Sequence, residues 1–98
     1  MNQIIEVADA MTGALDIFPV VRGQQTEVQI WGDPEGLRSL AKLLVTLADY
    51  DQSESDAPDG SRAHTHLSPN RHLGYPSSSV QISRGDAKGS CELPDFME

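Results

Sequence analysis

The chain has 98 residues, of which 38% are hydrophobic, and a formal net charge of −8. This length indicates a single domain with a modest core, and we expect residues 1–98 to form it. The excess of carboxylates argues against binding to nucleic acid or to an anionic membrane. It would either attract a basic protein partner or serve only to keep the protein soluble.

The sequence also lacks the usual marks of a secreted or membrane protein. Cys91 is the single cysteine, so no internal disulfide can form, and its Gly-Ser-Cys-Glu surroundings favour a passive thiol. The first residues have neither the basic patch nor the apolar run of a secretory signal. No stretch approaches the roughly 18 apolar residues of a transmembrane helix. We therefore expect a soluble, cytoplasmic protein without a cofactor.

Three strand candidates begin the chain. Residues 3–7 form a short apolar run, residues 15–21 form a second run in which Pro19 favours an edge position, and residues 26–31 form a third. Their close spacing predicts antiparallel hairpins. In the third run, Val28 and Ile30 would share one face, and the opposite face would carry Glu27, Gln29 and Trp31.

A helix is predicted from Asp33 to about Ala48. Asp33 is a good N-cap, and Pro34 suits the first helical position, where its missing N–H is not needed. The apolar residues then recur at helical spacing. We expect the face towards the core to carry Leu37, Leu40, Ala41, Leu44, Leu47 and Ala48, with Leu43 and Tyr50 at its edge.

An acidic loop at about residues 49–61 separates this helix from two further strand candidates, 62–67 and 79–83. Residues 85–98 resemble a flexible, exposed tail. The predicted order is β-β-β-α-β-β. It indicates an α+β fold, a small two-layer sandwich in which one main helix packs on one face of a mostly antiparallel sheet of four to five strands.

One helix can cover only one face of such a sheet, so the other face would be open. Strand alternation places a mixed polar and aromatic set on it. Three interpretations remain: a solvated face, a surface that binds a partner or a second copy of the chain, and a metal or small-molecule site. The expected open face carries Glu27, Gln29, Trp31, His64, His66, Ser79, Gln81 and Ser83.

The strongest metal-like feature is the pair His64 and His66, because alternate strand positions place both imidazoles on one side. His72 would be a third ligand, although that strand carries no matching carboxylate. The sequence has no nucleophile turn of the Gly-x-Ser-x-Gly type and no glycine-rich phosphate loop. We expect a non-enzymatic protein, with a metal-binding protein or metal-dependent enzyme as the alternative.

Three motifs carry a family resemblance: QIWGDPEGL at residues 29–37, LAKLL at 40–44 and HTHL at 64–67, followed by VQIS at 80–83. Their order and spacing resemble immunity protein 32 of bacterial polymorphic toxin systems. The resemblance implies a protein that binds and neutralises a cognate toxin, with His64 and His66 as the family's histidine pair.

These observations predict a binding protein, most simply a toxin-neutralising immunity protein that uses its open sheet face and its acidic loop. A structural homodimer is a further alternative. The residues expected to contact a partner are Trp31, His64, His66, Gln29, Gln81, Asp49, Asp51, Glu54 and Asp56.

Overall fold

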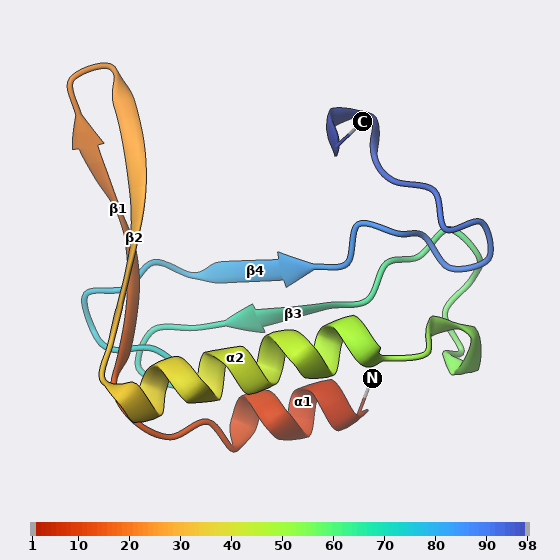
Figure 1. The fold of residues 1–98 in the computed structure, drawn as a ribbon, viewed down its shortest axis with the longest axis horizontal. Coiled ribbons are helices and arrows are strands. Elements are labelled where there is room, and N and C mark those ends of the chain that lie inside the picture. Colours follow the sequence, from red (N-terminus) through yellow and green to blue (C-terminus); the bar gives the residue numbers. More distant parts are fainter. Residues whose placement is uncertain (1, 98) are drawn as a thin grey trace.

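The fold, described here for residues 2–97 from a computed structural model, contains both helices and strands (Figure 1). The α+β class is confirmed, but the order of helices and strands is α-β-β-α-β-β. No helix within these residues is long and apolar enough to cross a membrane. The elements are α1 (Asn2–Asp9), β1 (Leu15–Arg22), β2 (Gln25–Gly32), α2 (Pro34–Asp49), the 3-10 helix η1 (Gln52–Glu54), β3 (His64–Leu67), β4 (Val80–Ser83) and the 3-10 helix η2 (Asp95–Met97).

The strand predicted at residues 3–7 is wrong, because this segment belongs to helix α1. Ile4 and Ala8 are buried and Val7 is partly buried, whereas Ile5 is exposed. Spacings of three and four residues are those of one helix face. The adjacent Ile4 and Ile5 favoured a strand, but the helical period explains the observed burial.

The strands form two separate two-stranded antiparallel sheets, β1–β2 and β3–β4, where one sheet of four to five strands was predicted. In Figure 1, β3 and β4 run alongside α2, whereas the β1–β2 hairpin stands away from both helices. Gly23 begins the two-residue hairpin turn with φ 62°, a conformation that glycine adopts without strain.

The base of the hairpin is attached to the body through residues 74–78. The carbonyl oxygen of Leu15 accepts a hydrogen bond from the N–H of Gly74 at 2.9 Å. That of Ile17 accepts one from the N–H of Ser78 at 2.9 Å, and the Ile17 N–H donates to Oγ of Ser77 at 3.0 Å. A loop therefore occupies the position along β1 where a continuous sheet would need another strand.

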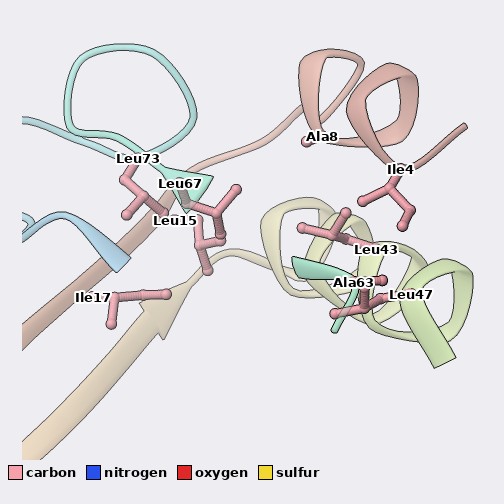
Figure 2. Packing of buried hydrophobic residues seen from close by; sticks show 9 residues of the cluster. All are labelled: Ile4, Ala8, Leu15, Ile17, Leu43, Leu47, Ala63, Leu67 and Leu73. Atoms are coloured by element: carbon pink, nitrogen blue, oxygen red, sulfur yellow. The ribbon is translucent and has the colours of Figure 1, made fainter. Parts of the chain in front are cut away.

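The core lies where the two helices meet β3 and the base of β1 (Figure 2). Ile4 of α1, Leu43 of α2 and Leu67 of β3 are its largest fully buried side chains. One helix was predicted to cover the sheet, but in the structure α2 packs against a second helix, α1. The complete cluster is Ile4, Ala8, Leu15, Ile17, Leu43, Leu47, Ala63, Leu67 and Leu73.

Helix α2 begins as the sequence predicts. The Asp33 carboxylate accepts hydrogen bonds from the N–H of Gly36 at 2.7 Å and from that of Ala14 at 3.1 Å. Gly36 lies so close to the Ala14 carbonyl group that a β-carbon there would overlap it. The N-cap thus also holds the segment before β1 against the start of the helix.

The buried face of α2 differs from the predicted one. Leu43 and Leu47 are buried and Leu40 is partly buried, whereas Leu37 and Leu44 are exposed. The predicted core face had Leu44 at its centre and Leu43 only at its edge. The buried face is displaced because α2 packs against α1 as well as against the strands.

The apolar face of β2 is also not where it was predicted. Val28 and Ile30 were expected to pack against the helix, but they are 65% and 53% exposed. The hairpin extends beyond the reach of α2, so only its base contributes to the core.

Candidate partner-binding surface

Sheet β3–β4 presents the histidine face that strand alternation predicted. His64 and His66 are exposed, whereas Thr65 and Leu67, which alternate with them along β3, are buried. His66 is paired with Gln81 and His64 with Ser83, and directly opposed residues point to the same face of a sheet. The structure therefore brings both histidines and Gln81 together on one exposed face.

The two imidazoles contact each other edge to face, with ring centroids 5.2 Å apart. Nδ1 of His64 also lies 3.0 Å from the carbonyl oxygen of Arg62. Beside them is an open hollow of about 300 Å³ whose other wall is the face of α1 that carries Ile5 and Asp9. Aromatic rings next to a shallow apolar depression form a surface suited to protein contact.

His72 borders the same hollow, but its ring is fixed by two neighbours. Its Nδ1 accepts a hydrogen bond from the Ser68 N–H at 3.1 Å, and its Nε2 lies 3.3 Å from the Asp9 carboxylate. The side chain is only 6% exposed. Among residues 2–97, no three His, Cys, Asp or Glu side chains are arranged to hold a metal ion. The geometry therefore gives His72 a supporting role beside the histidine pair.

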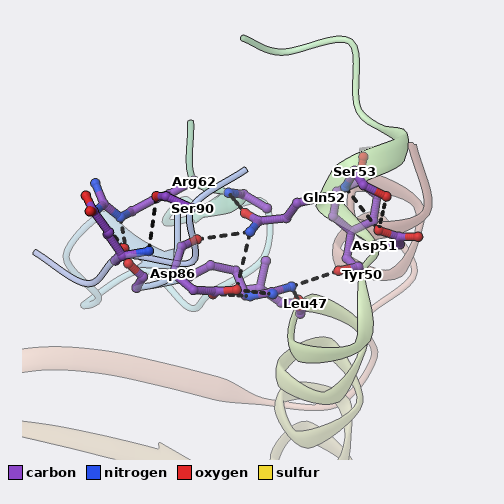
Figure 3. A network of polar contacts seen from close by, with 12 residues as sticks. Leu47, Tyr50, Asp51, Gln52, Ser53, Arg62, Asp86 and Ser90 are labelled. Carbon is purple, nitrogen blue, oxygen red and sulfur yellow. Dashed lines mark hydrogen bonds and ion pairs between the residues drawn. The ribbon is translucent and has the colours of Figure 1, made fainter. Parts of the chain in front are cut away.

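The acidic loop combines exposed carboxylates with a fixed backbone (Figure 3). Gln52 is buried, with its Oε1 accepting from the Ala63 N–H at 2.8 Å and its Nε2 donating to the Asp86 carbonyl oxygen at 3.0 Å. Nζ of Lys88 donates to the carbonyl oxygens of Ser55 and Ala57, each at 2.6 Å. Gln52 thus holds the beginning of the loop, and Lys88 holds its middle. Its exposed carboxylates are Asp49, Asp51, Glu54, Asp56 and Asp59.

The negative charge of this loop is not neutralised locally. None of its carboxylates takes part in an ion pair within the part of the chain that the structure describes. Lys88 binds backbone carbonyl groups of the loop instead of its side chains. The hydroxyl and the backbone N–H of Ser53 both donate to Asp51, which lowers the pKa of that carboxyl group. The loop therefore keeps its charge available to a partner.

His64 connects the loop to the histidine face. It lines the hollow beside α1 and also a smaller pocket of about 100 Å³ beside the loop. Tyr50, Gln52 and Lys88 line that second pocket. The acidic loop and the β3–β4 face therefore form one continuous surface.

Trp31 and Gln29 lie elsewhere, on the β1–β2 hairpin. Trp31 is 62% exposed, and its Nε1 donates to Oε1 of Gln29 at 2.8 Å. Gln29 donates in turn to Glu27 at 2.9 Å, and Glu27 also accepts from Arg22 at 3.2 Å. The sequence predicted one sheet face with Trp31 beside the histidines, which is wrong because the strands belong to different sheets.

Sequence reasoning missed the residues that support this surface. Arg84 is the main one: its Nη1 donates to the carbonyl oxygens of Leu47 and Tyr50 at the end of α2, and its Nε and Nη2 donate to Asp86. This pairing lowers the pKa of Asp86 and raises that of Arg84. A sequence signal existed, since α2 has no basic residue in its last turn, where one would stabilise the negative end of its dipole.

The fold and this surface define a small acidic α+β domain with an anchored, negatively charged loop beside an exposed sheet face. The family model for immunity protein 32 matches residues 27–85, which include most of β2 and all of α2, the acidic loop, β3 and β4. The chain belongs to the immunity protein 32 family. No curated protein and no solved structure matches it.

Proposed function

We propose that this chain is a non-enzymatic immunity protein that neutralises a cognate toxin by binding it directly. The acidic loop and the adjoining face of β3–β4 make the contact, and the complex forms in the cytoplasm. The observation that carries the proposal is the anchored loop, whose five exposed carboxylates have no ion-pair partner among residues 2–97. Membership of the immunity protein 32 family supports the toxin as the partner.

The acidic loop is pre-organised for binding. A flexible acidic segment would lose conformational freedom on binding, whereas this loop is already fixed by Gln52 and Lys88. Its charge would attract a basic surface over distances of about a Debye length, roughly 8 Å at physiological salt. The histidine pair and the hollow beside it then supply the short-range contacts. We expect the acidic loop to determine how fast the complex forms and the β3–β4 face to determine how long it lasts.

The test uses the toxin-like product of the neighbouring gene and measures association and dissociation rates by surface plasmon resonance. The triple variant Asp51→Asn, Glu54→Gln, Asp56→Asn should lower the association rate at least about tenfold, because it removes steering charge. His66→Ala should mainly raise the dissociation rate. Gln24→Ala, an exposed and uncharged change in the turn of the β1–β2 hairpin, is the matched control. Unchanged rates in both test variants would show that the contact surface is elsewhere.

Trp31→Ala forms a separate arm of the same experiment. Because Trp31 lies on the hairpin, a loss of affinity would extend the toxin interface to β2, and an unchanged affinity would confine it to the loop and β3–β4. Absence of any binding by the wild-type chain would refute the proposed function itself.

A further inference from the structure

The outer edge of β2 is an unpaired strand edge. The N–H and C=O groups of Leu15 and Ile17 that bond to residues 74–78 point away from β2. Because these directions alternate along a strand, the residues opposite Ile17 and Pro19, namely Ile30 and Val28, also direct their backbone groups away from the ladder. Within residues 2–97, neither of them makes a backbone hydrogen bond on that side.

The two edges of the hairpin differ in their protection. Along β1, residues 74–78 cover the base, and Pro19 directs a nitrogen without hydrogen outwards. Strand β2 contains no proline and no lysine, and all eight of its residues are in regular strand conformation. No segment within residues 2–97 forms backbone hydrogen bonds along its outer edge. Natural sheets usually block such an edge when it has no partner.

We propose that β2 pairs with β2 of a second copy of this chain, antiparallel and centred on Val28, to form a four-stranded sheet across a twofold axis. In this register the outward backbone groups of Val28 face those of Val28 in the second copy, and Ile30 faces Thr26. The exposed apolar residues of both hairpins then form a single face. From each copy, this face receives Pro19, Val21, Val28 and Ile30.

The polar face of β2 is compatible with the same register. Glu27 lies opposite Gln29 of the second copy, so no two carboxylates are directly opposed, and each Glu27 already accepts a hydrogen bond from Arg22 of its own chain. Like charges directly opposite each other would destabilise the pairing. The register therefore joins apolar residues on one face and complementary polar residues on the other.

Charge distribution favours a second copy over a strand from a strongly charged partner. Residues 15–32 carry Asp16, Arg22 and Glu27, a net charge of −1, so the remaining residues carry −7 of the total of −8. Two copies that meet through their hairpins bring together the least charged part of the molecule. The acidic loops remain outside this contact, so the dimer leaves the proposed toxin surface free.

The test measures self-association of the full chain by sedimentation velocity from micromolar to millimolar concentration. Val28→Pro removes an N–H that the β1–β2 ladder does not use. By symmetry it eliminates two hydrogen bonds of the dimer, which should raise the dimer dissociation constant about thirtyfold or more. Val28→Lys places two like charges at the twofold axis and should give a monomer. Val28→Thr keeps the N–H and the β-branched shape, and this control should remain dimeric.

Circular dichroism and urea unfolding establish that the variants fold, and toxin binding is measured separately so that the two proposals can fail independently. A dimeric wild type with monomeric Val28→Pro and Val28→Lys supports self-pairing. A wild type that is monomeric throughout, or a folded Val28→Pro or Val28→Lys variant that remains dimeric, overturns it. A monomer whose Val28 amide is protected from exchange only after toxin is added also overturns it, because the edge would then belong to the toxin.

Discussion

Arg84 connects the end of α2 to Asp86 through one guanidinium group. It binds the end of α2 through two carbonyl oxygens, and it pairs with Asp86 at 2.6 and 2.8 Å. Asp86 in turn accepts from Gln52 through its carbonyl oxygen. The acidic loop therefore depends on a basic residue that lies far from it in the sequence.

The Arg84–Asp86 pair predicts a specific dependence of stability on pH. The pKa of Asp86 is lower in the folded chain, so its contribution is present at neutral pH and is lost as pH falls below the ordinary aspartate pKa of about 4 towards the folded value. We expect Asp86→Asn to lower the free energy of unfolding by about 1 kcal/mol at pH 7, since the pair is partly exposed. This difference should shrink steadily below about pH 4.

Urea unfolding of both proteins between neutral and strongly acidic pH measures this difference. Asp56→Asn, an exposed change in the loop, controls for the loss of one negative charge. A wild-type advantage over Asp86→Asn that is the same at every pH would contradict the assignment.

Predictions from the sequence succeeded at residues whose signal is local. Asp33 and Pro34 specified the start of α2, and alternation placed His64 and His66 on one exposed face. The separation of Trp31 from the histidines could not be predicted, because it depends on how the strands combine into sheets. That combination depends on residues 74–78, whose hydrogen bonds to β1 have no local sequence signature.

At the scale of elements, the start of α2 and the segment before β1 approach each other closely. Gly13 has φ 86°, and a β-carbon on Gly36 would overlap the Ala14 carbonyl group. Helix propensity alone predicts that alanine at a helical glycine gains about 1 kcal/mol. We expect the opposite at this position: Gly36→Ala should destabilise the chain by about 2 kcal/mol or more.

Urea unfolding again provides the measurement. Ala41→Gly, an exposed change in the middle of α2, should lower stability by about 1 kcal/mol through propensity alone. If Gly36→Ala stabilised the protein, the close approach to Ala14 would have no energetic importance.

Helix α1, which was predicted to be a strand, shows why short apolar runs are ambiguous. Residues 3–7 contain too few positions to separate a period of two from a period of 3.6. The deciding residue is Ala8, which is buried beside Ile4 and Leu43 in the helix pair. The predicted strand covered residues 3–7 and so left Ala8 out.

At the scale of the whole molecule, the negative charge is concentrated on the body of the fold and not on the β1–β2 hairpin. The body carries the anchored acidic loop, and the hairpin is almost neutral. We therefore expect toxin binding to depend strongly on salt. Raising the ionic strength from about 50 to about 500 mM should slow association at least about tenfold and change dissociation little.

The triple loop variant provides the comparison, since it should lose most of this salt dependence while keeping its response to His66→Ala. Association rates that are equally sensitive to salt with and without the loop charges would place the steering field elsewhere on the molecule.

The position of Pro19 has a consequence for growth beyond a pair. A sheet that adds strands at both edges can extend without limit and form fibres. This hairpin offers only the edge of β2, because the imide nitrogen of Pro19 and residues 74–78 obstruct the edge of β1. A strand that pairs with β2 occupies the single free edge of the hairpin. Assembly along this direction therefore ends after a single step, which protects an exposed apolar hairpin from polymerisation.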